Sequence, residues 1–365
     1  MMNRREFLAG LAALLGSPAH VRAASLDSQD AVRLAATWQV EHGYQVGVLS
    51  HAASGEGALI VAVALDVPTR AHGLLRETSG SLLAVARRPG DWLLRWDRDG
   101  RALAWHWIEP RRAFAGHILA SVDGCTLYTT ETDLDTGAGL IGVRDAGSME
   151  KRAEWPTHGI DPHQLLWDAS HAGSLIVANG GVPTQPETGR VKHDLDRMDS
   201  SLARLDATTG ELLGQWRLDD RRLSLRHLAW NTASANNPVL GIALQAEHDS
   251  AEAKAGSPIL ALFDGQTLRT TSAPQSLAGY GGDIAALGAH IAVSCPRAQG
   301  VALFSVSGIW QGMQALNEAC ALATTTRQIV AGGSRHVLGL HPADATLATD
   351  VGIPPIRLDN HWIVL

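Results

Sequence analysis

Residues 72–100 read HGLLRETSGSLLAVARRPGDWLLRWDRDG, and this stretch decides the fold class. It contains two short apolar runs, Leu82–Ala86 and Leu93–Asp97, which are separated by Pro and Gly. The second run ends in the turn Arg98-Asp99-Gly100. Short apolar runs between turn residues predict brief antiparallel strands, whereas a helix would need a longer segment with a period of 3.6 residues.

The same pattern recurs along the chain: a first polar residue, a short strand, further strands about ten residues apart, and a polar turn. It begins again at His117, His163 and His227, and in weaker form near Asp283 and Cys320. Periods of about 40–60 residues with four strands each are typical of propeller blades. We therefore predict an all-β, seven-bladed β-propeller that forms a single domain over residues 24–365.

Six of these blades lie within residues 72–358, and the two chain ends supply the seventh. The C-terminal strand at about 360–365 is expected to join the N-terminal strands around Trp38, 44–49 and 58–65. Such closure removes free strand edges, which otherwise promote aggregation. Two stacked β-sandwiches are the alternative, but they fit the regular spacing less well.

Composition and charge narrow the class of protein. The chain has 365 residues, of which 45% are hydrophobic and 18% charged, so it can bury a large core. Its net charge of −7 is spread over charges of both signs without a basic stripe. No nucleic-acid partner is expected from such a sequence.

The N-terminus has the features of an export signal. Two adjacent arginines in Asn3–Leu8 precede an apolar run that ends at Leu15, and Val21-Arg22-Ala23 has the pattern of a cleavage site. The apolar run is too short to span a bilayer. The segment resembles a twin-arginine (Tat) signal, and an ordinary secretory signal is the alternative. We predict that residues 1–23 are a signal peptide and that the mature chain is periplasmic, without a transmembrane segment.

Three cysteines, Cys125, Cys295 and Cys320, show no Cys-x-x-Cys spacing. We interpret them as small buried hydrophobic residues, although one disulfide is compatible with an oxidising compartment.

Five histidines stand at the first position of their repeats: His72, His117, His163, His227 and His361. In a propeller, this position begins the innermost strand, beside the central channel. A ring of neutral imidazoles there would suit a transition metal such as iron, copper or zinc. The alternative is that these side chains only form hydrogen bonds within and between blades.

Further candidates for ligand binding at the channel mouth are polar residues near these positions and in the long insertion at 179–193. They are Arg70, Glu131, Asn179, Glu187, Arg190 and Arg226. Guanidinium groups match carboxylates and phosphates, so the arginines would bind an anion. Inter-blade salt bridges with Glu131, Glu187 or Asp161 are the alternative for Arg70 and Arg226. Long loops in compact domains are often functional, but a purely structural insertion is equally compatible.

Taken together, several strings resemble the DUF1513 family, whose members have a WD40/YVTN-like propeller fold. The match covers nearly all of the mature chain. The strings are Arg70–Gly73, Ala86–Gly90, Gly116-His117, Thr129–Glu131, Gly159–His163, Ala178–Gly181, Gly189-Arg190, Ser224–Leu228 and Asp359–Trp362.

The resemblance implies a Tat-like signal and partners in periplasmic iron acquisition, namely imelysin-like and di-haem oxidoreductase-like proteins. It implies no established activity. The chain also departs from the family pattern at Ile118, Gln164, Val191 and His193. Relatives usually carry a glutamate where Gln164 stands, so any role of that carboxylate is in doubt here.

No nucleophile elbow, P-loop, dinucleotide fingerprint or Ser/His/Asp pattern is present. The sequence therefore favours a binding module that holds a metal or docks partner proteins at its channel mouth. A metal-dependent hydrolase or lactonase, with Glu131 and Asn179 as ligands, is the alternative, and it rests on fold analogy alone.

Overall fold

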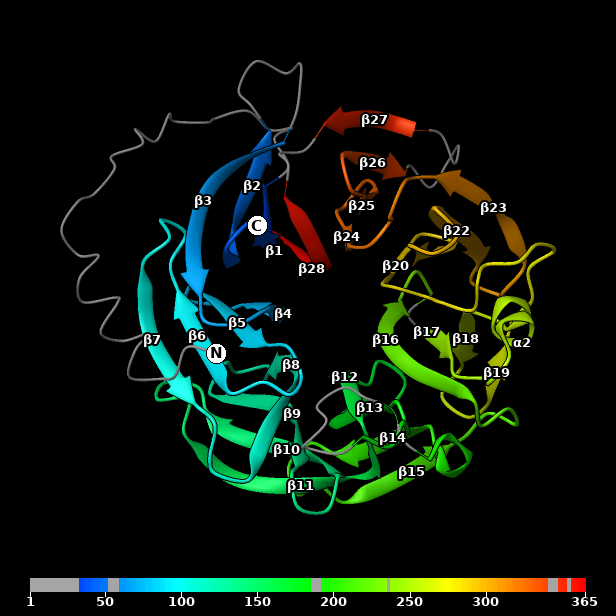
Figure 1. Ribbon diagram of the computed structural model, residues 1–365. Coiled ribbons are helices and arrows are strands. Elements are labelled where there is room, and N and C mark those ends of the chain that lie inside the picture. Colours follow the sequence, from blue (N-terminus) through cyan, green and yellow to red (C-terminus); the bar gives the residue numbers. More distant parts are fainter. Residues whose placement is uncertain are drawn as a thin grey trace.

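The structure is a computed structural model that describes residues 33–51, 59–184, 192, 194–234, 237–340, 347–352 and 356–365. Its β-sheets are arranged in a ring around a common centre (Figure 1). The predicted signal peptide at residues 1–23 lies outside the described residues. Among the described residues, no helix is both long enough and apolar enough to cross a membrane.

Five of the sheets have four antiparallel strands each, and consecutive strands pair within each sheet. The first is β4 (Ala71–Arg76), β5 (Leu82–Ala86), β6 (Trp92–Trp96) and β7 (Ala102–Trp107). The second is β8 (Arg112–Ala120), β9 (Thr126–Asp133), β10 (Ala138–Asp145) and β11 (Lys151–Ile160). The third is β12 (Pro162–Trp167), β13 (Ser174–Asn179), β14 (Ser201–Asp206) and β15 (Leu212–Trp216). The fourth is β16 (Leu223–Asn231), β17 (Val239–Ala246), β18 (Leu260–Phe263) and β19 (Leu268–Thr270). The fifth is β20 (Ile284–Leu287), β21 (His290–Cys295), β22 (Gly300–Ser305) and β23 (Trp310–Ala315).

The remaining strands form one eight-stranded sheet in the order β27-β26-β25-β24-β28-β1-β2-β3. They are β1 (Arg33–Val40), β2 (Gly43–His51), β3 (Leu59–Val67), β24 (Leu322–Thr324), β25 (Ile329–Gly332), β26 (His336–Leu340), β27 (Leu347–Gly352) and β28 (Arg357–Val364). A single parallel pair, Leu322 with His361, joins its two halves.

The predicted closure of the ring by the chain ends is confirmed. The C-terminal strand β28 pairs with β1 in antiparallel register, for example Trp362 opposite Ala36. Each first strand also packs against the first strand of the next sheet, in the cycle β4, β8, β12, β16, β20, β24, β28 and back to β4. This ring of antiparallel sheets is a β-propeller and excludes the two stacked sandwiches.

Burial differs with the place of a strand in its sheet. The second strands β5 and β13 are buried at every residue, whereas the outer strands β15 and β23 are only partly covered. Polar turns connect the strands, as the sequence predicts. The Asp97 carboxylate accepts hydrogen bonds from the amides of Asp99 and Arg101, and Gly100 takes a φ of 82°, which other residues rarely adopt.

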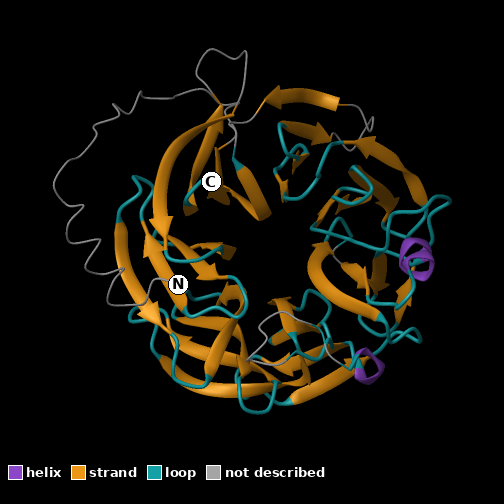
Figure 2. Cartoon of the chain, in the orientation of Figure 1, coloured by secondary structure: helices purple, strands orange, loops and turns teal. Residues whose placement is uncertain are grey.

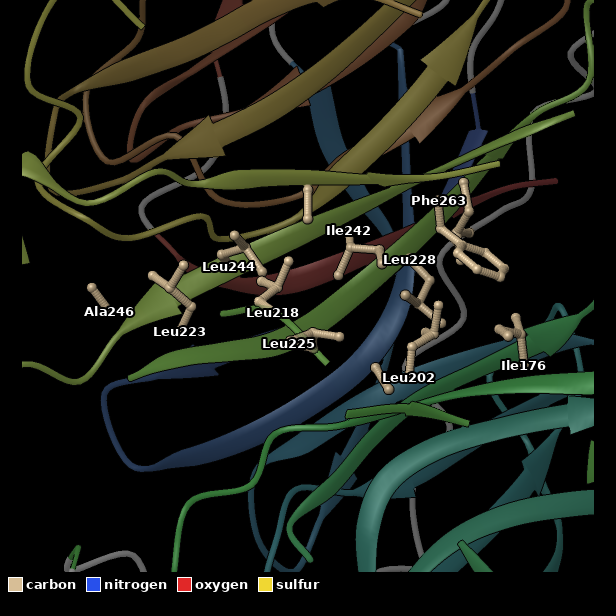
Figure 3. Packing of buried hydrophobic residues seen from close by; sticks show 13 residues of the cluster. Ile176, Leu202, Leu218, Leu223, Leu225, Leu228, Ile242, Leu244, Ala246 and Phe263 are labelled. Carbon is tan, nitrogen blue, oxygen red and sulfur yellow. The ribbon is translucent and has the colours of Figure 1, made fainter. Parts of the chain in front are cut away.

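The hydrophobic core is divided into clusters that lie between neighbouring sheets. One of them joins β12–β15 to β16–β19 and includes Ile176, Leu202, Leu225, Ile242 and Phe263 (Figure 3). Each fully buried side chain of this size contributes about 1.5–3 kcal/mol through the hydrophobic effect. Helices are minor elements in the described residues, with α2 (Ala251–Gly256) and a 3-10 turn at Leu195–Arg197 on the outside of the ring (Figure 2).

The cysteines do not pair. Cys125, Cys295 and Cys320 are all free. Cys295 is buried as expected, but Cys125 is exposed, which corrects its assignment as a core residue. Cys125 follows the turn residues Asp123 and Gly124 and precedes β9, so it never enters the strand core.

Candidate metal centre

The five predicted histidines come together at the centre of the ring. His72, His117, His163, His227 and His361 belong to β4, β8, β12, β16 and β28, which are all first strands of their four-strand groups (Figure 1). Their ring centroids lie 4.4–5.7 Å apart in nine of the pairs. The sequence-based expectation that these side chains converge on one axis is therefore met. We call this group the histidine cluster.

A local irregularity of the strand accompanies each histidine. The regular pairing of β4 with β5 shifts between Ala71 and Leu74, and that of β16 with β17 shifts between Leu225 and Leu228. The same kind of shift surrounds His117 in β8 and His163 in β12, and the pairing of β28 with β1 also shifts near His361. Such bulges re-aim a side chain out of the regular alternation, and they are enriched beside functional sites. Here they direct imidazoles from separate sheets toward one point.

The Nε2 atoms of three histidines face one another. His227 Nε2 lies 2.9 Å from His163 Nε2 and 3.0 Å from His361 Nε2. Oxygen atoms face the opposite side of two of these rings: the Gly282 carbonyl accepts from His227 Nδ1, and Asp283 Oδ1 lies 3.4 Å from His361 Nδ1. When Nδ1 donates in this way, the Nε2 of a neutral imidazole carries a lone pair. His227 Nε2 therefore carries a lone pair that faces His163 and His361.

His72 is held in the same manner. Its Nδ1 lies 3.5 Å from Asp359 Oδ1, and the other carboxylate oxygen of Asp359 accepts from Arg70 Nε. Histidine ligands of metals almost always direct their second nitrogen at a carboxylate or a backbone carbonyl, because this fixes the tautomer and the ring orientation. Gly282, Asp283 and Asp359 supply this arrangement for three rings of the histidine cluster.

Burial keeps four imidazoles of the histidine cluster neutral. It lowers the pKa of His72 to about 3, and it lowers the pKa of His117, His163 and His227 well below the ordinary value, with neighbouring imidazoles adding to the effect. Burial alone would raise the pKa of Asp359, but His72, Arg87 and Arg70 hold it well below its usual range. His72, His117, His163 and His227 are thus neutral beside the ionised carboxylate of Asp359, which is the protonation state that metal binding requires.

The geometry fits a transition metal ion. One ligand nitrogen from each of His72, His117, His163 and His227 lies within 4.8 Å of all the others, and His227, Asp283 and His361 form a second such group. A tetrahedral ion with bonds of about 2.0–2.1 Å holds its ligand nitrogens about 3.4 Å apart. Small rotations of these side chains would therefore bring them into coordination distance.

Two cavities of different character border the histidine cluster. One, which we call the vestibule, is open, has a volume of about 470 Å³, and is lined by Gln164, Trp230, Asp283, His361 and Trp362 among others. The other, which we call the arginine pocket, measures about 20 Å³ and includes His72, His163, His227, Arg88 and Arg226 in its walls. The cluster therefore separates a wide, partly acidic side from a narrow, basic side.

The remaining predicted residues are divided between this site and the frame of the propeller. Arg70 pairs with Asp359 of β28, and Arg226 pairs with Asp161, which precedes β12, so both make the inter-sheet salt bridges considered from the sequence. Asp161 also pairs with Arg88. Burial lowers the pKa of Arg226 to about 10, so it stays charged at neutral pH.

Glu131 and Asn179 are not brought to the histidine cluster. Glu131 is fully buried in β9, where its oxygens lie 2.7 Å from Arg144 Nη2 and 2.6 Å from Lys151 Nζ of the same sheet. This corrects its expected position at the channel mouth. Asn179 ends β13, and its amide donates to the Thr157 carbonyl at 3.0 Å and to Ser201 Oγ at 3.2 Å, so it ties two sheets together.

The insertion at 179–193 is described only in part. Glu187 and Arg190 lie outside the described residues. Lys192 is described, and its Nζ pairs with Glu247 at the end of the next sheet. Gln164 accepts a hydrogen bond from the Leu228 amide at 2.6 Å.

Sequence reasoning missed the residues that orient the imidazoles. In the sequence, Asp283 stands out only as the start of a weaker repeat. Asp359 stands out only as part of the segment Asp359–Trp362, which resembles the family. An acidic residue at the first position of a blade is the signal that pointed to Asp283. No sequence signal marks the Gly282 carbonyl.

One family model matches most of the chain. The family model described as "Protein of unknown function (DUF1513)" matches residues 65–365. The chain belongs to the DUF1513 family. No curated protein matches it.

Solved structures share the fold of this DUF1513 protein at low sequence identity. The structure titled Kuenenia stuttgartiensis hydrazine synthase is 11% identical, with a TM-score of 0.57, and the match covers 85% of this chain and 92% of that chain. A streptogramin B lyase structure is also 11% identical, with a TM-score of 0.53, and the match covers 77% and 82% of the two chains. At this identity the likeness supports a propeller fold and nothing about activity.

Proposed function

We propose that this protein is a seven-bladed propeller that binds a transition metal ion in its histidine cluster. The observation that carries the proposal is the set of converging Nε2 atoms of His163, His227 and His361, with oxygens behind two of the three rings. The lone pair of His227 Nε2 either accepts a hydrogen bond from a neighbouring imidazole or binds a cation. Burial disfavours the charged form of these imidazoles, and neutral imidazole nitrogens are metal ligands, so we propose a metal ion as the occupant.

The ligand set indicates the class of metal. Neutral imidazole suits zinc, copper, iron and nickel, whereas magnesium and calcium prefer oxygen ligands. His72, His117, His163 and His227 would hold the ion, while His361 and Asp283 border the vestibule through which it enters. A bound ion would act as a Lewis acid. The four imidazoles would fill the coordination positions of a tetrahedral ion and leave none for a water or a substrate, which favours a binding module over a hydrolase.

The blade count and the cellular setting belong to the same proposal. The cycle of first strands from β4 to β28 supports seven blades, with the eight-stranded sheet counted as two. Export by the Tat-like segment at residues 1–23 would place the protein in the periplasm. Iron acquisition, with imelysin-like and di-haem oxidoreductase-like partners, is supported only by the family resemblance.

The decisive experiment is elemental analysis of protein purified without a histidine tag or a chelator. We expect near-stoichiometric iron, copper or zinc in the wild type and its loss in the His163→Ala/His227→Ala double variant. His42→Ala/His336→Ala is the matched control, because both of these imidazoles are exposed and the control should retain the metal. Titration of the chelator-treated protein with Co²⁺, followed by visible absorption, reports directly on nitrogen coordination.

Two results would overturn the proposal. One is an absence of bound metal in the wild type even after incubation with excess zinc, copper or iron. The other is equal metal content in the wild type and in a folded double variant. In either case the histidines would be structural.

A further inference from the structure

His361 differs from the other four members of the histidine cluster in its access to solvent. It is half-buried, with 12% of its side chain exposed, whereas the other four are buried. It also lines the vestibule, and none of the other four does. The vestibule measures about 470 Å³, and a water molecule takes up about 30 Å³, so a hydrated ion fits inside it. An ion that enters the cluster from the vestibule therefore meets His361 first.

His227 belongs to two possible ligand groups at once. It completes the group of four buried histidines, and it also forms a group with Asp283 and His361. Its Nδ1 donates to the Gly282 carbonyl, so Nε2 is its only ligand nitrogen. That atom lies 2.9 Å from His163 Nε2 and 3.0 Å from His361 Nε2. Because one lone pair binds one ion at a time, the two groups are alternative positions of a single ion.

Asp283 holds His361 in the orientation that this sharing needs. Its Oδ1 lies 3.4 Å from His361 Nδ1. Two backbone amides fix the carboxylate, since Oδ1 accepts from Ile284 and Oδ2 accepts from Leu322 at 3.0 Å. A carboxylate at Nδ1 favours the tautomer whose Nε2 carries a lone pair. Asp283 also lines the vestibule, where its negative charge attracts a cation.

The two positions differ in the number of imidazoles that they offer. The outer position, beside the vestibule, has the imidazoles of His227 and His361, and the inner position has four imidazoles. Four neutral imidazoles complete a tetrahedral coordination, so the inner position holds a transition metal ion more tightly. His227 can remain bound during the move between them, because its Nε2 faces both His163 and His361.

We propose that His361 is a transfer ligand, which takes up a transition metal ion from the vestibule and delivers it to the four buried histidines through the shared Nε2 of His227. The inference rests on the proposed metal function. The bond from His361 Nε2 to the ion breaks as bonds to the buried imidazoles form, and neutral ligands replace one another without a change of oxidation state. A residue that binds the ion only in transit changes the rates of uptake and release by the same factor. His361 therefore sets the speed of metal exchange, and the buried histidines set the affinity.

The test uses Co²⁺ as the probe and chelator-treated full-length protein, followed by stopped-flow visible absorption. Uptake starts on mixing with Co²⁺, and release starts on mixing the loaded protein with excess EDTA. His361→Asn keeps a donor for Asp283 near the place of Nδ1 but has no nitrogen at the place of Nε2. We expect this variant to bind one Co²⁺ with the affinity of the wild type, while uptake and release both slow by about tenfold or more.

His290→Gln is the matched control. His290 is a half-buried histidine in β21, and its Nδ1 faces Gln311. Because His290 does not belong to the histidine cluster, its substitution should leave both rates unchanged. His361→Gln is a second test variant in case His361→Asn does not fold, since it also lacks an imidazole nitrogen.

Three results would overturn the inference. The first is a folded His361 variant that takes up and releases Co²⁺ at the rates of the wild type. The second is a variant that loses affinity without a change in the uptake rate, because His361 would then be a permanent ligand. The third needs no variant: two Co²⁺ ions bound at once with nitrogen coordination would contradict the sharing of His227.

The same measurements separate this inference from the proposed function. If the wild type binds no Co²⁺, the metal function is refuted and the transfer role falls with it. If the wild type binds one Co²⁺ and the rates do not depend on His361, only the transfer role is refuted.

Discussion

Acidification should destabilise the metal-free protein well before its carboxylates titrate. The perturbation is a shift from about pH 7.5 to about pH 5 in the presence of a chelator. Burial lowers the pKa of His72 to about 3 in the folded state, while in the unfolded chain it returns to about 6.5. The unfolded state therefore binds the proton first, and stability is lost as the pH falls from about 6.5 toward 3.

The magnitude follows from these two values. At pH 5 the difference in proton binding by His72 alone costs the folded state about 2 kcal/mol. His117, His163 and His227 shift in the same direction, so the total loss exceeds this figure. Asp359 acts in the same sense, but only near and below the ordinary range of an aspartate, at about pH 4.

Urea denaturation at several pH values, followed by tryptophan fluorescence, measures the effect. His72→Gln should reduce the loss between pH 7.5 and 5 by about 2 kcal/mol, while exposed His336→Gln should keep the slope of the wild type. A free energy of unfolding that stays constant over this range would refute the reasoning. An unchanged slope in His72→Gln would show that this imidazole is not buried in its neutral form.

Three further predictions concern the propeller sheets that support the histidine cluster. Gly142→Ala should destabilise the protein by about 1–3 kcal/mol in urea denaturation, because the new Cβ would lie 2.0 Å from Glu131 Oε1. Gly256→Ala is its control and should change stability by less than about 0.5 kcal/mol, because the new Cβ would have no atom within 4 Å. Arg144→Ala should lower the free energy of unfolding by about 3–5 kcal/mol in the same assay, because it removes one of the two cations that pair with buried Glu131. An unchanged urea midpoint would contradict the role of this ion-pair network. Deletion of residues 356–365 should prevent folding, because β28 links β24 to β1. Circular dichroism and size-exclusion chromatography measure this, and a stable monomeric truncated form would show that closure is dispensable.

The sequence predicts the architecture well because each level of the fold leaves a local signal. Turns such as Asp97–Gly100 mark strand ends, and apolar runs such as Leu82–Ala86 mark the fully buried second strands. The histidine at the start of five of the repeats indicates which strand is innermost. The closing strand could be located for the same reason, since His361 repeats the pattern at the C-terminus.

The same reasoning failed for residues whose role depends on their place within a sheet. From the sequence, Glu131 is expected at the channel mouth as a polar residue near a first-position histidine, but β9 is the second strand of its sheet. Only first strands border the central axis, so Glu131 is enclosed by Arg144 and Lys151 instead. The bulges around the histidines also have no reliable sequence signal, because a register shift depends on the partner strand.

Unmatched nitrogen atoms inside the histidine cluster support a ligand site there. His117 Nε2 and His163 Nδ1 are buried without hydrogen-bond partners, and each such group costs about 1–3 kcal/mol in the folded state. Apolar side chains could fill the same volume between the first strands without this cost, as they do in the clusters between sheets. A protein that keeps several neutral imidazoles at its axis, at a cost to its own stability, gains from them only when their lone pairs bind something else.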